Sequence, residues 1–438
     1  MSSLKVALLG LGTVGKGVYE SIIQTHEKKL TEAVGKKVEI VGVLVKDHQK
    51  ERGIKKDILV TTDVNQILKL PHVDIVFEAI VGIEPANTYI RQFLEKGSHV
   101  ISANKQLLAY KGKELAEVAN KYNRFLTFEA AVAGGIPLLR TIIQLLQVNG
   151  ITKLEGILNG TSNYILSKMR TEQSNFNEVL KEAQDLGYAE ADPSSDVLGT
   201  DAFYKLMILS NLIYQKQPNW ENVNKVGVNE VSQADILIGE RLGFRLKLVA
   251  TLQKKEQDVL AEVRPVFVSN EHPLYNVEGV DNGIVLNTDL VGTLLLQGPG
   301  AGSLATASAM IEDLVYISQK GTPNIQTPRF SYNSLVEGKE EPSIWLTIVE
   351  LPTDELVKEY KQYSSINFAN KDLTAVHQEE IKHNDGYIIG EILVGKSENV
   401  ERFIEELPQK IRIYPISPKG INIATKNVEL TRLQTTTS

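Results

Sequence analysis

An apolar run at the N-terminus leads directly into a glycine-rich turn. Lys5 to Leu9 is followed by Gly10-Leu11-Gly12-Thr13-Val14-Gly15 and then by an expected helix from Lys16 to about Gln24. In such a turn Gly10 allows the tight bend, Gly12 lets backbone N–H groups approach a pyrophosphate, and Gly15 lets helix and strand pack closely. Glycine triplets also occur by chance in loops. A strand before the turn and a helix after it nevertheless predict a dinucleotide-binding fold, in which Thr13 and Val14 also border the cofactor.

Length and charge limit what else the chain contains. At 438 residues we expect about three domains. The 47 basic and 54 acidic residues give a formal net charge of −7 without a basic tract, which makes nucleic acid and anionic membranes poor partners. The absence of cysteine excludes disulfides, thiolate nucleophiles and cysteine-ligated metals. With no signal-peptide pattern and no apolar run of roughly 18 residues, we expect a cytoplasmic protein.

The first 130 residues alternate between apolar strands and helical stretches, which predicts a parallel α/β sheet of the Rossmann type. The expected strands after the first are Val38–Val45, Val73–Ala79, His99–Ser102 and Phe125–Phe128, and the expected helices include Ala86–Lys96 and Gly112–Tyr122. Such a fold binds its ligand at the carboxyl ends of the strands.

Two residues after the second strand bear on the choice of nicotinamide cofactor. Lys46 would attract a 2′-phosphate and so favour NADP, whereas Asp47 could bind the ribose 2′-hydroxyl and keeps NAD possible. Lys-Asp is equally typical of an ordinary solvated turn.

Two further segments at strand ends could carry chemistry. Ser102-Ala103-Asn104-Lys105 places Lys105 where substrate and nicotinamide would meet, although a surface lysine leading into a helix is more common. In Phe128 to Pro137, small residues and the pair Gly134-Gly135 indicate close backbone approach. Carbonyls beside Glu129 could hold a monovalent cation, and a tight crossing between domains would explain the same residues.

The middle of the chain holds the densest set of polar residues. An acidic loop from Gly187 to Asp196 leads into an expected helix over 197–213, on which Asp201 and Lys205 share one face. Such a pair is usually a solvated salt bridge, but the apolar residues around it indicate a partly buried helix. Together with Glu190 and Asp196, this arrangement suits a small substrate with an ammonium group and supplies a proton donor.

At this point the sequence resembles the homoserine dehydrogenases. The resemblance covers roughly residues 4–320 and rests on five motifs in the family's order. These are the nucleotide turn, Ser102-Ala103-Asn104-Lys105, Glu129-Ala130 to Gly135-Ile136-Pro137, Asn159-Gly160-Thr161-Ser162-Asn163-Tyr164, and Ala183 to Pro193 with its continuation through Asp196, Gly199 and Asp201 to Lys205.

The resemblance implies NAD(P)-dependent interconversion of L-aspartate 4-semialdehyde and L-homoserine, a step toward threonine and methionine. With Lys46 after the second strand, we expect NADP(H) to be preferred and NAD(H) to be possible. The resemblance assigns Lys205 as proton donor, Lys105 as a second lysine at the reacting oxygen, and Glu190, Asp201, Gly187 and Asp196 to the substrate. Cofactor contacts would come from Gly10, Gly12, Thr13, Val14, Gly15, Lys46, Lys105 and Gly302. Glu129, with Val132, Gly134 and Ile136, would hold Na⁺ or K⁺. Residues 131–338 would form a catalytic and dimerisation domain, and the chain a homodimer or higher homo-oligomer.

Two opposing effects act on the proposed proton donor. Burial or the nearby Lys105 would lower the pKa of Lys205 from its ordinary value near 10.4, while Asp201 one turn away would raise it. The sequence leaves the direction open.

The last hundred residues have the order βαββαβ, which predicts a ferredoxin-like domain over 343–420 and resembles an ACT domain. A linker is expected over 338–342. The turn Glu350-Leu351-Pro352-Thr353-Asp354 lacks the glycine that would admit an amino-acid effector, so a role in stabilising a dimer is an alternative.

Two other functions fit part of the pattern. A non-catalytic regulator that responds to NADP(H) would not need Lys105, Glu190, Asp201 and Lys205, yet all four are present. An oxidoreductase for a different small amino-acid aldehyde would use the same residues.

Overall fold

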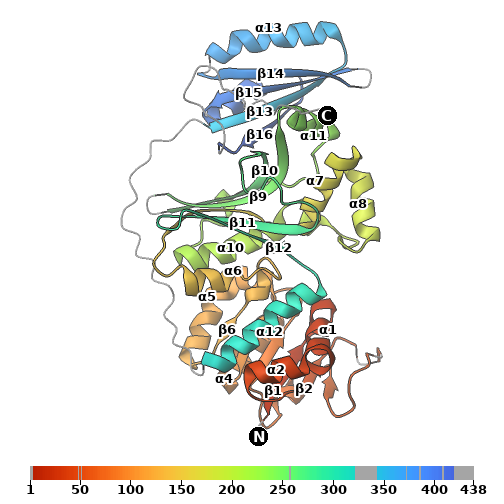
Figure 1. Ribbon diagram of the computed structural model, residues 1–438, viewed down its shortest axis with the longest axis vertical. Coiled ribbons are helices and arrows are strands. Elements are labelled where there is room, and N and C mark those ends of the chain that lie inside the picture. Colours follow the sequence, from red (N-terminus) through yellow and green to blue (C-terminus); the bar gives the residue numbers. More distant parts are fainter. Residues whose placement is uncertain are drawn as a thin grey trace, which may run out of the picture.

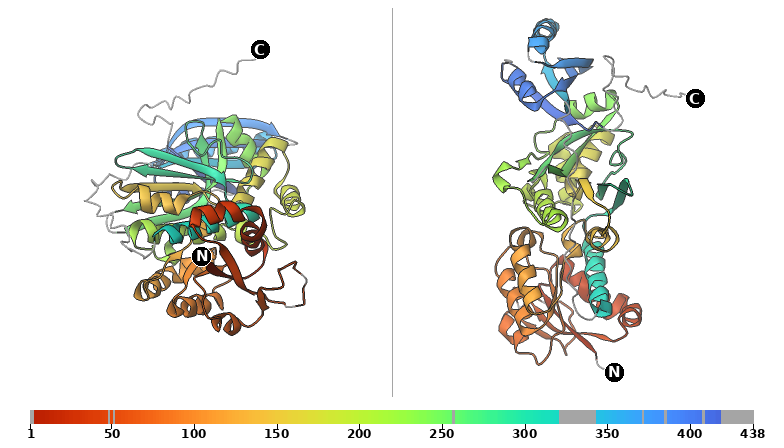
Figure 2. Two further views of the ribbon diagram at one scale, coloured as in Figure 1. Left: turned by 60° about the horizontal axis from the view of Figure 1, so that its bottom comes forward. Right: turned by 90° about the vertical axis from the view of Figure 1, so that its left-hand side faces the viewer.

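The computed structural model describes residues 3–47, 49–50, 52–255, 258–320, 343–370, 372–383, 386–406 and 409–418. Three parts follow one another along the long axis of the molecule (Figure 1), and a view from the side shows the same order (Figure 2). The expected linker over 338–342 and the last two residues of the expected third domain lie outside the described residues. Within the described residues no helix combines the length and the apolar character needed to cross a bilayer.

The N-terminal part is a six-stranded parallel sheet in the order β3-β2-β1-β4-β5-β6. Its strands are β1 (Leu4–Leu9), β2 (Val38–Leu44), β3 (Leu59–Thr61), β4 (Ile75–Glu78), β5 (His99–Ser102) and β6 (Leu126–Thr127). The helices are α1 (Thr13–Glu20), α2 (Glu27–Val34), α3 (Val64–Leu68), α4 (Ala86–Lys96) and α5 (Lys105–Lys121). The expected Rossmann-type sheet is therefore confirmed, and the short β3 is a strand that the pattern missed.

Two helices of this part differ from expectation at their first residues. α1 begins at Thr13 rather than at Lys16 and continues as a π-helical segment over Ser21–Thr25. α5 begins at Lys105 rather than at Gly112, because the side chain of Asn104 accepts a hydrogen bond from Leu107 N and so caps the helix. This cap makes Lys105 the first residue of a helix.

The parallel register gathers the functional segments at one edge of the sheet. Leu9 lies beside Glu78, and Glu78 lies beside Ser102. The nucleotide turn after β1, the loop after β4 and the start of α5 therefore share the carboxyl edge. This edge faces the middle part of the molecule, whereas the N-terminus lies at the opposite end (Figure 1).

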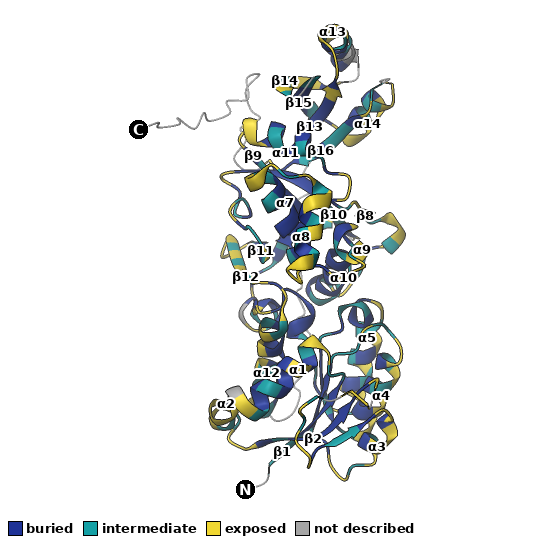
Figure 3. Ribbon diagram, turned by 90° about the vertical axis from the view of Figure 1, so that its right-hand side faces the viewer, coloured by how far each residue is buried: buried dark blue, intermediate teal, exposed yellow. Residues whose placement is uncertain are grey.

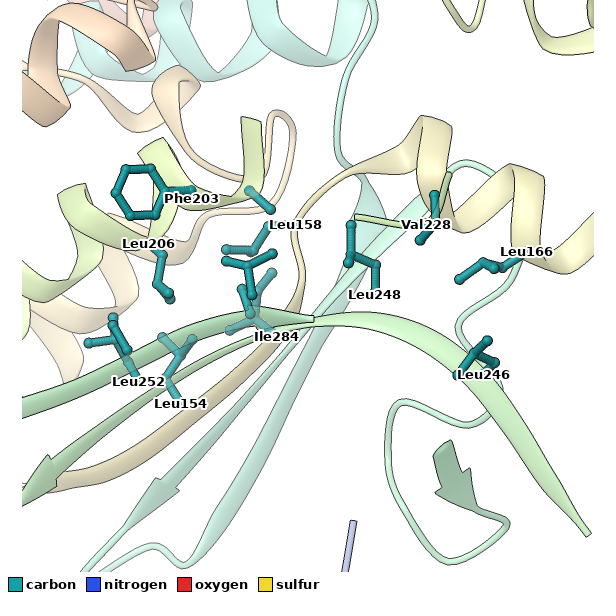
Figure 4. Packing of buried hydrophobic residues seen from close by; sticks show 14 of the residues in the cluster. Leu154, Leu158, Leu166, Phe203, Leu206, Val228, Leu246, Leu248, Leu252 and Ile284 are labelled. Atoms are coloured by element: carbon teal, nitrogen blue, oxygen red, sulfur yellow. The ribbon is translucent and has the colours of Figure 1, made fainter. Parts of the chain in front are cut away.

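The middle part is built on a mainly antiparallel sheet with helices on one face, and among its described strands the one parallel pairing is that of the short β8 with β10. Its strands are β7 (Ile151–Ile157), β8 (Asn224–Lys225), β9 (Phe244–Lys255), β10 (Asp258–Ser269), β11 (Asp281–Thr288) and β12 (Thr293–Pro299). Its helices are α6 (Leu138–Arg140), α7 (Gly160–Glu172), α8 (Phe176–Asp185), α9 (Ser194–Val197), α10 (Thr200–Tyr214) and α11 (Gln233–Arg241). Leu154, Leu252 and Ile284 of the sheet pack with Phe203 and Leu206 of α10 (Figure 4).

The chain then returns to the N-terminal part. α12 (Ser303–Lys320) packs against α1, and its Ala307, Met310, Leu314 and Ile317 belong to the core under β1 and β2. The predicted boundaries at 130 and 338 stay predictions, but in space α12 belongs with the nucleotide sheet. In Figure 3 the buried face of α12 lies against α1 and its exposed face points outward.

The C-terminal part has the expected βαββαβ order. It consists of β13 (Ser343–Leu351), α13 (Asp354–Asn370), β14 (Thr374–His383), β15 (Gly386–Gly395), α14 (Ser397–Glu405) and β16 (Ile411–Ile416). The strand order β16-β13-β15-β14 with antiparallel neighbours is ferredoxin-like. A parallel bridge between Phe267 of β10 and Ile416 of β16 joins this sheet to that of the middle part.

A buried carboxylate fixes the junction between these two parts. Asp235 of α11 is fully buried, and Arg412 Nε of β16 lies 2.6 Å from its Oδ1. Tyr414 donates its hydroxyl to Asp235 Oδ2 at 3.0 Å, and Ser232 also donates to this oxygen. One side chain on α11 therefore satisfies donors from both parts.

Replacing Asp235 by alanine should lower the free energy of unfolding by about 3 kcal/mol, because Arg412 and Tyr414 would lose their shared acceptor in a buried place. Urea unfolding at pH 7 measures this loss. Glu379→Ala is the matched control, since the pair Arg241–Glu379 at 3.1 Å joins the same two parts with the Arg241 side chain 68% exposed. The control should lose less than about 1 kcal/mol. Equal losses in the two variants would contradict the role given to Asp235.

Candidate active site

Each position of the nucleotide turn that holds glycine does so for a different structural reason. Gly10 has φ +98°, and a Cβ there would lie 2.7 Å from Ala79 O; a Cβ on Gly15 would collide with Gly10 O. A Cβ on Gly12 would meet nothing within 4 Å, so this residue borders open space. The N–H groups at the start of α1 have no side-chain cap. They therefore fit the pyrophosphate of a dinucleotide.

A second glycine loop lies against this turn. Gly302 has φ +111° and precedes α12, whose Ser303 donates its hydroxyl to Thr13 O at 2.9 Å. A Cβ on Gly17 would lie 2.6 Å from Ser303 Oγ, so α1 and α12 approach closely. The structure thus brings Gly302 to the nucleotide turn.

Lys46 and Asp47 lie where the pattern placed them, just after β2 and both exposed. Asp47 Oδ1 accepts a hydrogen bond from Gln49 N at 2.8 Å. Lys46 is the first cation after the strand, and its contact with a 2′-phosphate stays a prediction.

One carboxylate lies between the two candidate catalytic lysines. Lys205 Nζ is 2.8 Å from Asp201 Oδ2 on the same helix, and Lys105 Nζ contacts Asp201 Oδ1 from the start of α5. Asp201 and Lys205 have side chains 2% and 8% exposed, whereas that of Lys105 is 43% exposed. The predicted semi-buried pair on α10 is therefore present, and it joins the middle part to the nucleotide sheet.

Lys205 is further held by the backbone. Its ammonium group donates to Leu158 O at 2.6 Å as well as contacting Asp201. An ammonium group has three N–H donors, so one remains beyond these two contacts. Lys205 is thus rigidly placed with a donor left for a reacting group.

Burial decides the direction that the sequence left open. Burial lowers the pKa of Lys205, and the positive charge of Lys105 adds to this, against the opposing effect of Asp201. For Lys105 the charge of Asp201 is the largest influence, and it raises the pKa of that amine. Burial alone would raise the pKa of Asp201, but the two lysines hold it well below its usual range. Lys105 therefore stays charged, while Lys205 releases its proton more readily than a solvated lysine.

Asn159 connects this cluster to the acidic loop, a role that the sequence did not reveal. Its amide donates to Asp196 Oδ1 at 2.7 Å and to Asp201 Oδ2 at 2.9 Å, while its carbonyl accepts from Ser162 N and caps α7. Burial is the largest influence on Asp196 and raises the pKa of its carboxyl. The available signal was the helix-capping pattern of Asn159-Gly160-Thr161-Ser162.

Glu190 and Gly187 lie on the loop between α8 and α9 and are exposed. Gly187 has φ +76°, and Gln184 donates to Glu190 O at 3.2 Å. The charge of Glu190 also raises the pKa of Lys105, although less than that of Asp201. Glu190 therefore lies close enough to Lys105 to act on it electrostatically, whereas a contact of Gly187 with the substrate stays a prediction.

Comparisons with known proteins point to one family. Residues 10–129 match a family model described as the NAD binding domain of homoserine dehydrogenase, and residues 137–315 match one described as homoserine dehydrogenase. The homoserine dehydrogenase of Bacillus subtilis is 44% identical over 319 residues, which are 72% of this chain and 73% of that protein.

The chain belongs to the homoserine dehydrogenase family.

Solved homoserine dehydrogenases share the fold as well. The one from Thiobacillus denitrificans has a TM-score of 0.82 at 30% identity and covers 95% of this chain and 98% of its own. A hyperthermophilic archaeal homoserine dehydrogenase, solved in complex with NADPH, has a TM-score of 0.63 at 26% identity and covers 73% of this chain and 98% of its own. The family resemblance and the dinucleotide-binding domain predicted from the sequence are thus confirmed.

The residues expected to hold a monovalent cation lie at a crowded crossing of the homoserine dehydrogenase fold. Glu129 is buried, and its two oxygens accept from Leu139 N and Arg140 N at 2.8 Å each. The carbonyl of Ile136 accepts from Leu138 N at 2.7 Å, and a Cβ on Gly134 would collide with Gly300 O. These contacts explain the small residues of 132–136 by packing. A cation held by Glu129, Val132, Gly134 and Ile136 stays a prediction.

A buried carboxylate at the carboxyl edge was not anticipated. Glu78 ends β4 with no exposure, accepts from Ser102 Oγ at 2.5 Å and from Ile80 N at 2.7 Å, and so ties β4 to β5. Ser102 Oγ in turn accepts from Asn104 N at 3.1 Å, next to Lys105. Burial raises the pKa of Glu78 to about 7 from 4.5. In the sequence Glu78 is one residue of the expected apolar strand Val73–Ala79, and no motif marked it as a functional residue.

The raised pKa of Glu78 makes stability depend on pH. Between pH 4.5 and about 7 the folded chain keeps a proton that the unfolded chain releases, so this residue's contribution to stability falls as pH rises. A glutamine side chain does not ionise, so the stability of Glu78→Gln has no such loss as pH rises. Relative to the unsubstituted chain, the variant should gain about 3 kcal/mol in free energy of unfolding between pH 4.5 and pH 8. Urea unfolding of both proteins at the two pH values measures the change.

Glu84→Gln serves as the control for this measurement. Asn87 and Thr88 lower the pKa of the exposed Glu84, so its variant should change in the opposite direction and by less. A pH-independent difference between Glu78→Gln and the unsubstituted chain would show that folding does not raise the pKa of Glu78.

Proposed function

We propose that the chain interconverts L-aspartate 4-semialdehyde and L-homoserine by NAD(P)-dependent hydride transfer, in the biosynthesis of threonine and methionine. The observation that supports this most is the pair of lysines, Lys105 and Lys205, held by Asp201 at the carboxyl edge that carries the nucleotide turn. Family membership supports the same reaction.

A bound nicotinamide supplies or accepts the hydride. In the reducing direction negative charge grows on the aldehyde oxygen, and the fixed positive charge of Lys105 stabilises that charge more than the neutral ground state. Lys205, whose pKa burial lowers, donates the proton that completes the alcohol. In the oxidising direction the neutral Lys205 amine takes the proton back.

The amino-acid end of the substrate needs carboxylates that the lysines have not neutralised. Asp201 already contacts both lysines and Asn159, so it orients the site. Asp196 and Glu190 are better placed to receive the substrate ammonium, with Gly187 allowing their loop to approach. The carboxylate cluster thereby selects a substrate with an amino group.

The proton-donor assignment predicts a loss in kcat. Lys205→Ala should lower kcat by roughly 10² or more and leave NADPH binding nearly unchanged, because the amine contacts Leu158 O and Asp201 rather than the nucleotide turn. Initial rates with homoserine and NADP, together with fluorescence titration of NADPH, measure both quantities. Lys225→Ala is the control. Lys225 contacts Thr200 at the start of the same helix and has no proposed part in catalysis or binding. A decrease below about tenfold for Lys205→Ala would move the donor role to Lys105.

We propose that NADP is the preferred cofactor and that NAD is used less well. Lys46 follows β2 at the edge where the adenosine ribose of a dinucleotide lies, and the archaeal relative was solved with NADPH.

The cofactor assignment predicts that loss of Lys46 weakens the binding of NADPH more than that of NADH. Lys46→Ala should weaken NADPH binding roughly fivefold and NADH binding hardly at all, because an exposed charge pair contributes up to about 1 kcal/mol. Titrations with both cofactors measure this, and Lys50→Ala on the same turn is the control. An equal loss for the two cofactors would identify Lys46 as a solvated turn residue.

We also propose that the C-terminal part is an ACT-like domain that supports a homodimer or higher homo-oligomer. The βαββαβ order supports the first point, and the turn after β13, which has no glycine, favours assembly over effector binding. A Na⁺ or K⁺ ion near Glu129 would stabilise the crossing between the first two parts.

A further inference from the structure

A polar cleft lies at the amino ends of β4 and β5, opposite the edge that carries the nucleotide turn. It has a volume of about 230 Å³, and its polar lining comes from His72, Asp74, Lys96, Ser98, His99 and Arg124. These residues belong to the loop before β4, the end of α4, the start of β5 and the segment before β6. In Figure 1 this end of the sheet faces away from the middle part. The cleft is therefore separate from the proposed active site.

Arg124 borders the cleft with a guanidinium group that has no partner in the described part of the chain. Its Nε atom is buried without a hydrogen-bond partner, and its guanidinium group forms no hydrogen bond or ion pair with any residue that the structure describes. The group lies beside Gly97, where an added Cβ would be 3.5 Å from one of its terminal nitrogens. A partly buried cation without a partner costs free energy, which an anion in the cleft would offset.

Two further donors line the same cleft. His99 Nδ1 accepts from Phe125 N at 2.9 Å, so the neutral ring carries its proton on Nε2. Burial and the charge of Arg124 lower the pKa of His99 to about 4, which keeps the ring neutral at pH 7. Lys96 Nζ donates to Leu70 O at 3.2 Å and has two further N–H groups.

Asp74 is the one acidic side chain among the residues that line the cleft, and both of its oxygens already have partners. Asp74 Oδ2 accepts from Lys5 N at 2.7 Å, and Asp74 Oδ1 lies 2.6 Å from His72 Nε2. The end of α4 adds partial negative charge, which Lys96 as its last residue offsets. Lys96 and Arg124 against Asp74 leave the lining with a net positive charge.

We propose that this cleft binds a small oxyanion with a phosphate group. A planar guanidinium suits the bidentate recognition of phosphate, and an ammonium and an imidazole N–H add donors from other elements. Because the nucleotide turn lies at the other ends of the same strands, this anion is neither the pyrophosphate of the cofactor nor the reacting substrate.

Calorimetric titration with inorganic phosphate tests the proposal. The full chain is first saturated with NADPH, so that the nucleotide turn is occupied, and chloride keeps the ionic strength constant. Phosphate should bind the unsubstituted chain and bind Arg124→Gln at least about tenfold more weakly. Arg91→Gln is the control, because Arg91 lies on α4 but pairs with Glu114 and Asn87. Its affinity for phosphate should not change.

Thermal unfolding of the same proteins gives an independent result. Without phosphate, Arg124→Gln should be at least as stable as the unsubstituted chain, since the arginine has no partner to lose. Phosphate should raise the Tm of the unsubstituted chain and of Arg91→Gln only. Absence of phosphate binding, equal binding by Arg124→Gln, or a lower Tm of Arg124→Gln without phosphate would overturn the proposal. Tighter binding of acetate than of phosphate would also overturn it, in favour of a carboxylate site.

Discussion

The contact of Asp201 with two lysines joins the parts of this molecule that have to cooperate. Lys105 comes from the first turn of α5 on the nucleotide sheet, and Lys205 comes from α10 of the middle part. A single carboxylate between two ammonium groups keeps them together despite their repulsion. The cluster retains one net positive charge, which suits a site where negative charge develops on a substrate oxygen.

Backbone-anchored amides fix the geometry of that cluster. Asn104 caps α5 and so fixes the start of the helix, whose first residue is Lys105. Asn159 caps α7 and donates to Asp196 and Asp201. Each asparagine satisfies a helix terminus and also positions a charged group. Loss of either would therefore disturb the fold and the site together.

Much of the fold could be predicted from the sequence, because local patterns specify it. The nucleotide turn, the parallel strands and the C-terminal βαββαβ order depend on residues that are near one another in the chain. The family resemblance placed Gly302 at the cofactor, but local patterns could not predict the packing of α12 on α1, since it rests on contacts such as Ser303 with Thr13, 290 positions apart. The continuity of the sheet through Phe267 and Ile416 is likewise a long-range pairing.

The site was predictable to a similar extent. Lys105, Asp201 and Lys205 stood out by motif and spacing, but which effect controls the pKa of Lys205 depends on burial that spacing does not give. Glu78 resembled any strand residue, and its role became visible only through Ser102 of the neighbouring strand.

The pH dependence of kcat for aldehyde reduction, compared between the unsubstituted chain and Asp201→Asn, tests the electrostatic role of Asp201 most directly. If protonated Lys205 is the donor, kcat falls at alkaline pH as that lysine loses its proton and becomes neutral. Asp201 raises the pKa of Lys205 against the effect of burial. In Asp201→Asn the alkaline decrease should therefore begin at lower pH. A decrease at the same pH in both proteins would show that Asp201 does not control the ionisation of the proton donor.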